Sequence, residues 1–399
     1  MLPEIKHLPV NWVDGMKISK QHFVEIENFT YDHLRDASAA QLTTYNYGLL
    51  PSATSGLKSL EANIQCDRSQ QIKLTIHTCR AITASGCRIE IVNQDKFALN
   101  VPFSEILAAY NLPPTKEQDF YAVLTVNPFE RVAVGQPAMQ EVPPRHPFAR
   151  PSYQLGIVPA SLINAEDFGA GHLVVGKIKF ANGELNTDTS YIPACMSVTS
   201  HQELLKWYYN FGNSLAEIET NAFKIIQKIK LKSQKSTLTD SVYYLVEKLL
   251  FALANGLMNF KWIVPQQAPI FMVEFLLRLA QTTRTTIDCL TEREKEEILS
   301  YLAEWADMTP AGLSNKFNSV LAIQYNHIEI VPQLSEIEEF IKIIHGLFHK
   351  LSQLEFIGKR KGQQIFVIES PVAEPTQSIP TQQQVTPEPE KPKSRWSPL

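Results

Sequence analysis

The chain has 399 residues, of which 44% are hydrophobic and 20% are charged, and its 37 basic and 41 acidic side chains give a formal charge of -4. This ordinary globular composition supplies enough apolar mass for two or more domains. The near-neutral charge balance argues against a nucleic-acid-binding protein, which concentrates Lys and Arg on one face. No uninterrupted apolar run has the length of a membrane-spanning helix, and the opening residues lack the layout of a signal peptide. We therefore expect a cytoplasmic protein.

The first two hundred residues carry mainly strand patterns. Four short runs have the alternation or the β-branched content of strands, the last two being separated by an Asn-Pro pair: residues 72–76, 88–91, 120–126 and 132–134. Residues 173–180 precede Asn182 and Gly183, and this pair predicts a hairpin because it tolerates the positive φ angles of a type I′ turn. The proline-rich stretch 143–147 should be a loop. Together these patterns predict a β-sandwich or barrel within residues 1–196.

After residue 196 the hydrophobic period changes to that of a helix. Eight apolar residues follow one another at alternating steps of four and three, which predicts a long helix packed against other helices: Leu204, Tyr208, Phe211, Leu215, Ile218, Ala222, Ile225 and Ile229. A second helix is expected after Thr237, although Gly256 lowers the expected stability of its last turn. A third should begin near Pro269, because proline suits the first turn of a helix.

Two further helix starts are predicted by capping boxes, in which a hydroxyl and a carboxylate satisfy free N–H groups reciprocally. Thr291 and Glu294 form the first box, and Ser335 and Glu338 repeat it before another apolar-periodic run. We therefore expect a helical bundle over residues 197–356. A short terminal hairpin is expected over residues 357–370. Residues 371–399 are rich in proline and polar side chains, which predicts a disordered tail.

Residue types that carry chemistry do not form a recognisable active site in this sequence. No phosphate-binding glycine loop or nucleophile-elbow motif occurs, and the five cysteines form no CxxC pair. His345 and His349 have a zinc-compatible spacing on one predicted helix, but the glutamate of an HExxH motif is missing. We expect no catalytic residue, metal or cofactor. An enzyme or metal-dependent protein that uses this histidine pair remains the alternative.

The opening of the chain combines a tryptophan, an acidic residue, Gly-Met, an apolar position and Gln-His-Phe: Trp12, Asp14, Gly15, Met16, Ile18, Gln21, His22 and Phe23. This pattern resembles the first motif of the TssK family, the baseplate subunit of bacterial type VI secretion machines. Lys20 stands where proline is common in the family. Weaker similarities follow at residues 45–49, 120–131 and 191–195. The resemblance covers roughly residues 8–355.

The resemblance implies an α+β multidomain protein. A β-sandwich or barrel-like domain, similar to the shoulder of phage receptor-binding proteins, would precede the helical bundle. It further implies a non-enzymatic homotrimer in a contractile injection machine. This trimeric adaptor would bind the baseplate wedge proteins through its N-terminal domain and a membrane-anchoring complex through its C-terminal region, at the inner face of the inner membrane. Many members carry a C-terminal membrane-docking domain, which we expect this chain to lack, because few residues separate the bundle from the tail.

Partner binding is expected at the opening motif, through Trp12, Gly15, Met16, Gln21, His22 and Phe23. Large apolar groups so near a chain end must cover either this protein's own core or a partner. In the alternative interpretation they form an N-terminal strand and turn that only pack onto the sandwich. In the tail, Lys393, Arg395 and Trp396 combine cationic and aromatic side chains, the composition of a small docking element. The alternative there is a solubilising tail without a partner.

Overall fold

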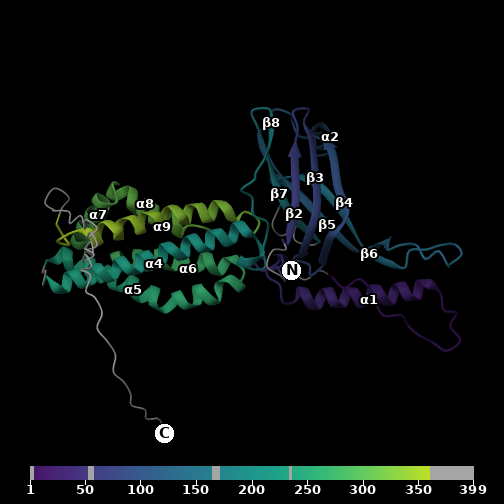
Figure 1. Cartoon of the computed structure of the whole chain (residues 1–399), viewed down its shortest axis with the longest axis horizontal. Coiled ribbons are helices and arrows are strands. Elements are labelled where there is room, and N and C mark those ends of the chain that lie inside the picture. Colours follow the sequence, from purple (N-terminus) through teal and green to yellow (C-terminus); the bar gives the residue numbers. More distant parts are fainter. Residues whose placement is uncertain (1–3, 53–57, 164–170, 233–235, 360–399) are drawn as a thin grey trace, which may run out of the picture.

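The computed structural model describes residues 4–52, 58–163, 171–232 and 236–359. A β-rich part and a bundle of helices lie end to end (Figure 1), so the α+β multidomain class expected from the sequence is confirmed. The predicted terminal hairpin begins within the described residues but lies outside them from residue 360 onward, as does the whole predicted tail. Where one domain ends and the next begins stays a prediction.

The first of two four-stranded sheets is built around β3 (Gln71–Ile82). This strand pairs antiparallel with β2 (Leu60–Cys66), with β4 (Arg88–Pro102) and with the short β1 (Gly48–Leu49). The side chains of Ile72, Leu74 and Ile76 on its inner face are fully buried. The alternation in the sequence therefore identified the buried face correctly.

The second sheet has the strand order β6 (Phe148–Pro159), β5 (Gln118–Val134), β7 (His172–Ala181) and β8 (Glu184–Thr187). The β7–β8 hairpin is confirmed, with Asn182 and Gly183 at φ angles of 53° and 79°. The division of residues 120–134 into two runs is wrong, since β5 is one continuous strand. The register shifts between Asn127 and Arg131, so Pro128 lies in the bulge, where its missing N–H costs no ladder hydrogen bond.

The inner faces of the two sheets pack against each other. A Cβ atom on Gly176 of β7 would lie 2.2 Å from Cδ1 of Ile64 on β2, so glycine allows this close approach. The helix α2 (Phe103–Ala109) links the sheets, and the ring of Phe103 lies 5.2 Å from Phe120 and 4.8 Å from Phe180. A single core therefore fills the space between them.

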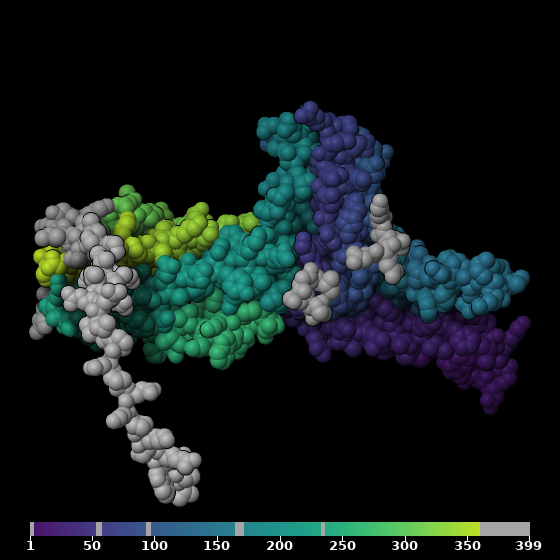
Figure 2. Space-filling view, in the orientation of Figure 1, coloured from purple at the N-terminus to yellow at the C-terminus, as the bar shows by residue number. Residues whose placement is uncertain are grey.

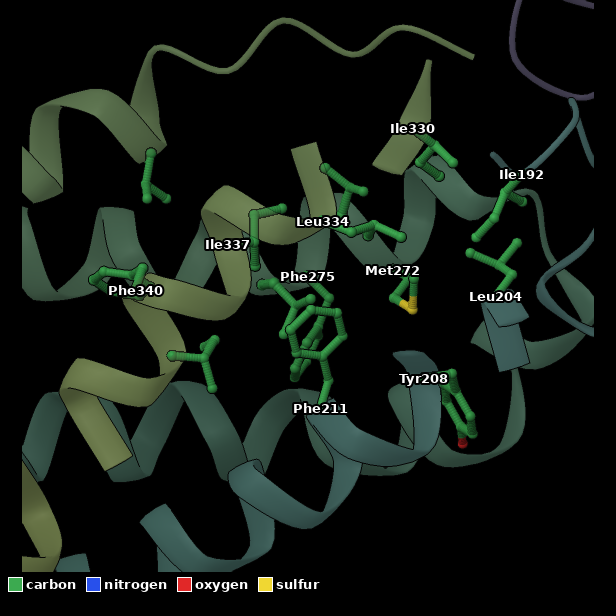
Figure 3. Packing of buried hydrophobic residues seen from close by; sticks show 14 of the residues in the cluster. Ile192, Leu204, Tyr208, Phe211, Met272, Phe275, Ile330, Leu334, Ile337 and Phe340 are labelled. Atoms are coloured by element: carbon green, nitrogen blue, oxygen red, sulfur yellow. The ribbon is translucent and has the colours of Figure 1, made fainter. Parts of the chain in front are cut away.

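The bundle contains six α-helices within the described residues: α4 (Gln202–Leu231), α5 (Thr237–Trp262), α6 (Pro269–Asp288), α7 (Glu292–Trp305), α8 (Pro310–Leu321) and α9 (Ile330–Gln353). Short 3-10 turns occur at Ala160–Leu162, Val198–Ser200 and Val264–Gln266. All eight residues of the predicted α4 seam are buried. Figure 3 shows part of this core, where Phe211 of α4 lies beside Phe275 of α6, while the Tyr208 ring stacks on Phe260 of α5. None of the described helices is both long and apolar enough to cross a membrane.

The predicted helix starts are confirmed in part. Thr291 caps α7 with the expected box, and Pro269 is the first residue of α6. The start predicted at Ser335 is wrong, because α9 begins at Ile330 and the Ser335 hydroxyl donates to the Val331 carbonyl inside the helix. The helix α8 was not expected. The helix α9 is therefore longer than its capping pattern predicts, because tertiary packing can override such local signals.

Gly256 does not end α5, which continues to Trp262. A Cβ atom at this glycine would lie 2.3 Å from Cε2 of Phe275 on α6, a distance that no real side chain accepts. The glycine therefore serves the close packing of two helices rather than a helix end.

The β part is joined to the bundle by buried hydrogen bonds. In the segment that leads from the β part into α4, the Ala194 carbonyl accepts a hydrogen bond from the Leu49 N–H at 2.8 Å. Ring nitrogens of His327, which precedes α9, lie 2.9 Å from the Tyr47 carbonyl and 2.8 Å from the Tyr325 hydroxyl. Burial lowers the pKa of His327 to about 4, so the ring is neutral near pH 7. Its Nε2–H then donates to the carbonyl, and Nδ1 accepts from the hydroxyl.

Candidate functional site

The six residues expected to bind a partner lie on an N-terminal strap, defined here as residues 4–19, and on the first turn of α1 (Lys20–Ala39). The strap has no strand or helix, and α1 extends away from the bundle (Figure 1). The N-terminal strand of the alternative interpretation is therefore wrong, and α1 was not predicted. The buried side of α1 consists of Asn28, Asp32, Arg35 and Ala39. Because this stripe is mainly polar, hydrophobic periodicity could not reveal the helix.

One carboxylate ties the strap to α1. Asp32 is fully buried, and its Oδ2 accepts hydrogen bonds from the backbone N–H groups of Lys6 (2.7 Å) and His7 (3.0 Å). Its Oδ1 accepts from the Arg35 guanidinium at 2.6 Å, and that guanidinium also donates to the Glu4 carbonyl at 3.3 Å. Burial alone would raise the pKa of Asp32, but these donors outweigh it and hold the pKa below its ordinary value. Asp32 is therefore an ionised anchor for the strap.

The strap and α1 lie beside an arm formed by the ends of β5 and β6, defined here as residues 127–152. The Arg131 guanidinium donates to Asn28 Oδ1 at 2.8 Å and pairs with Glu27 at 2.9 Å, both on α1. The ring of Phe129 packs 4.3 Å from His7 of the strap. Figures 1 and 2 show α1 and the arm reaching in the same direction. The three segments therefore form one projecting surface.

Gly15, Met16 and His22 shape the turn between the strap and α1. Gly15 has a φ angle of 79°, within a turn in which the Met16 N–H donates to the Val13 carbonyl. Such a φ favours glycine. His22 completes a capping box with Ser19, whose N–H donates to His22 Nδ1 at 3.1 Å. These contacts fix the entry into the helix.

The large apolar side chains of this region point to solvent. The exposed fraction is 48% for Trp12 and 57% for Phe23, and Val13 and Ile18 are each 60% exposed. The Trp12 ring has an edge contact with the His22 ring at 5.8 Å. Met16 is half-buried, and Gln21 is exposed and donates to Glu25. The structure therefore places all six predicted residues on the strap and the first turn of α1, and leaves Trp12 and Phe23 about half exposed.

Sequence reasoning missed several residues of this surface. Asp32 and Arg131 hold it together but look like ordinary surface residues in the sequence. Exposed apolar side chains also lie on the strap, on α1 and on the arm: Leu8, Leu34, Met139, Val142 and Phe148. No local pattern marks them, because the packing of the strap, α1 and the arm decides which of their side chains stay exposed.

The other predicted residues do not add to this surface. Lys393, Arg395 and Trp396 lie outside the described residues. On α9, His345 contacts the Glu217 carboxylate of α4, and its ring stacks at 6.5 Å on that of His349. Within residues 4–359, apart from the undescribed gaps, no three His, Cys, Asp or Glu side chains are placed to hold a metal ion. The alternative function, a metal site built on His345 and His349, therefore has no third ligand among the described residues.

No family model matches this sequence, and no curated protein matches it. Solved structures do resemble the chain. A crystal structure of TssK has a TM-score of 0.44 and 13% sequence identity, with 86% of this chain and 70% of that chain covered. TssK from the type VI secretion system of EAEC, bound to a nanobody, has a TM-score of 0.44 and 14% identity, covering 82% and 99% of the two chains.

Two solved assemblies also contain a chain that is similar to this one. A type VI secretion TssK–TssF–TssG baseplate subcomplex has a TM-score of 0.43 and 17% identity, with 84% of this chain and 99% of the matched chain covered. A type VI baseplate complex has a TM-score of 0.47 and 14% identity, with 86% of this chain and 99% of the matched chain covered. All four are structures of TssK or of type VI secretion baseplate complexes. At such identities and TM-scores, function has to be argued from the chain's own residues.

Proposed function

We propose that this chain is a structural baseplate component of a type VI secretion machine, a trimeric adaptor that binds other baseplate subunits through the N-terminal strap and α1. The observation that carries this proposal is that Trp12 and Phe23 are about half exposed on a segment anchored by the buried Asp32. Single exposed apolar side chains are normal on a protein surface, but Trp12, Val13, Ile18 and Phe23 are all exposed within one anchored segment, as is common at interaction sites.

The energetics of the strap favour a protein partner. Each of the two aromatic side chains leaves on the order of 100 Å² in contact with water, and covering such an area contributes about 2–3 kcal/mol. Because Asp32 already holds the strap, binding would not have to order it, and this avoids part of the usual entropic cost of association. Tryptophan is also among the residues that most often dominate binding energy at interfaces.

The partners proposed for this surface are baseplate wedge proteins of the kind named in the similar subcomplex, TssF and TssG. The chain would act without catalysis, as a homotrimer in the cytoplasm, with its C-terminal region directed to a membrane-anchoring complex at the inner membrane. Docking of the tail through Lys393, Arg395 and Trp396 stays a prediction. A deletion of residues 371–399 that leaves secretion normal would contradict it.

The test replaces the exposed aromatic residues one at a time, as Trp12→Ala and Phe23→Ala, and measures capture of co-expressed wedge proteins of the same host. Because both side chains are about half exposed, each change should cost less than about 1 kcal/mol of stability. Phe223→Ala on α4 is the matched control, since Phe223 is 50% exposed but lies in the bundle. We expect the strap variants to lose wedge binding at an unchanged melting temperature, and the control to keep it.

Two results would contradict the proposal. One is full wedge binding by folded variants that lack Trp12 or Phe23. The other is a loss of binding that always follows a fall in melting temperature, which would mean that the segment only stabilises the fold. The trimer is tested separately by light scattering, where a mass near 45.1 kDa at micromolar protein would exclude it.

A further inference from the structure

Two arginine side chains on neighbouring strands of the first sheet share a single carboxylate. Arg80 of β3 and Arg88 of β4 both donate to Glu90 of β4, with N–O distances of 3.0 Å for Arg80 and 2.9 Å for Arg88. Arg80 lies opposite Glu90 in the ladder, and Arg88 is two positions before Glu90 on the same strand. All three side chains therefore project from one face of the sheet.

A third arginine reaches the same place from the second sheet. The Tyr153 hydroxyl of β6 accepts a hydrogen bond from the Glu90 N–H at 3.2 Å. The guanidinium of Arg150, also on β6, lies 5.9 Å from the centre of the Tyr153 ring. Arg150 forms no ion pair with any described residue, and its Nε is buried without a hydrogen-bond partner. We define Arg80, Arg88, Glu90, Arg150 and Tyr153 as the arginine cluster.

The arginine cluster carries more positive than negative charge. Burial alone would raise the pKa of Glu90, but the guanidinium groups of Arg88 and Arg80 outweigh it and hold the pKa below its ordinary value. Glu90 is therefore ionised, and arginine keeps its proton in proteins. Three guanidinium groups and one carboxylate leave a formal charge of +2. A dianion would neutralise this excess.

The backbone that carries the cluster is held in place, while its side chains remain accessible. Ile89 and Ile91, which alternate with Arg88 and Glu90 along β4, are buried in the core. The side chains of Arg80 and Arg88 are 28% and 41% exposed. Both β4 and β6 lie on the side of the β part away from the bundle (Figure 1). A ligand can therefore reach donors that are already positioned, which lowers the entropic cost of binding.

Phosphate fits the charge and the donors of the cluster better than a carboxylate does. The planar fork of a guanidinium group donates paired hydrogen bonds to either anion. A phosphate monoester carries a charge of about −1.5 to −2 at pH 7 and has three strong acceptor oxygens. A carboxylate has only two oxygens and a single charge, so it would leave part of the excess charge without a counter-charge.

We propose that the arginine cluster is a binding site for a phosphate dianion, either free phosphate or the phosphate group of a monoester. The anion would contact Arg150, which has no counter-charge of its own, and would compete with Glu90 for the guanidinium of Arg88. The inference goes beyond the proposed function and does not depend on it, because phosphate binding and capture of wedge proteins are measured in separate assays.

The first test titrates the full chain with inorganic phosphate in a calorimeter, in a phosphate-free buffer whose ionic strength is held constant with chloride. We expect saturable binding by the wild type, and binding about tenfold weaker by Arg150→Gln, as for the loss of one charged hydrogen bond. Arg278→Gln on α6 is the matched control, since Arg278 is exposed and pairs with a glutamate in the bundle. It should bind phosphate as the wild type does. No saturable binding at millimolar phosphate would overturn the proposal.

The second test uses Glu90→Gln, for which a binding site and a structural ion pair predict opposite results. The change removes the carboxylate that competes for Arg80 and Arg88, together with one negative charge. Phosphate should therefore bind roughly fivefold more tightly at low salt, although two ion pairs of the free protein are lost. Unchanged or weaker phosphate binding by the folded variant would overturn the proposal, because the cluster would then serve only the sheet.

The third test compares inorganic phosphate, glycerol 3-phosphate and succinate in the same assay. Tighter binding of glycerol 3-phosphate would assign the site to a phosphate monoester, and tighter binding of inorganic phosphate would assign it to the free ion. Both results support the proposal. Succinate that binds as tightly as the two phosphate ligands would overturn the assignment to phosphate.

Discussion

Replacing Asp32 by alanine tests whether a single buried carboxylate holds the N-terminal strap. The change removes the acceptor for two backbone N–H groups, of Lys6 and His7, and leaves the Arg35 guanidinium buried without its carboxylate. Breaking a buried charge pair by removing one partner costs about 3–5 kcal/mol. Since about 1.4 kcal/mol changes an equilibrium tenfold, the strap should open from about a hundred to a few thousand times more often.

Hydrogen exchange followed by mass spectrometry measures this opening directly. We expect peptides that contain the amides of Lys6 and His7 to exchange faster by about that factor, whereas peptides from α4 should not change. Asp36→Ala, one turn further along α1, is the control and should exchange as the wild type does. Unchanged exchange of residues 4–19 in Asp32→Ala would refute the anchoring role of the carboxylate.

The same anchor predicts a pH dependence. The folded-state pKa of Asp32 lies below its ordinary value, so its contribution to stability is present above about pH 4, the pKa range of an unfolded aspartate. The contribution is lost as the pH falls through the lowered folded-state pKa. Protection of the strap, corrected for intrinsic exchange, should therefore stay constant from neutral pH to about pH 5 and disappear in acid. The alanine variant should lack this transition.

Three further predictions concern packing and the joint between the β part and the bundle. Gly256→Ala should lower stability by about 1–3 kcal/mol in thermal or urea unfolding, because the added Cβ atom would overlap the Phe275 ring; an unchanged melting temperature would contradict this packing. Gly48→Ala should cost more, since its Cβ would lie 2.0 Å from the Ala194 carbonyl oxygen, which cannot rotate away. His327 has a pKa of about 4 when folded and about 6.5 when unfolded, so the unfolded chain takes up the proton first. Acidification from pH 6.5 to 4 should therefore remove up to about 3 kcal/mol of wild-type stability, and His327→Gln should flatten that curve.

Local patterns in the sequence determined much of the architecture. The unbroken seam from Leu204 to Ile229 predicted α4, and all its members are buried. Thr291 and Pro269 marked helix starts, and the Asn182-Gly183 pair marked the β7–β8 hairpin. These features are readable because periodicity, capping and turn chemistry depend only on residues within a few positions of one another. The opening motif likewise directed attention to Trp12 and Phe23, although it did not predict their conformation.

The tertiary structure decided what depends on contacts between distant residues. The buried stripe of α1 is polar, because Asp32 bonds the strap and Asn28 bonds the arm, and no hydrophobic pattern predicts such a helix. Ser335 has the sequence of a helix cap but lies inside α9. The clearest case is α5, which has apolar side chains on two opposite faces. Periodicity shows that both faces are apolar, but only the packing of α4 and α6 decides that the seam through Leu245 and Leu249 is buried and that the seam through Phe251 and Met258 is left exposed.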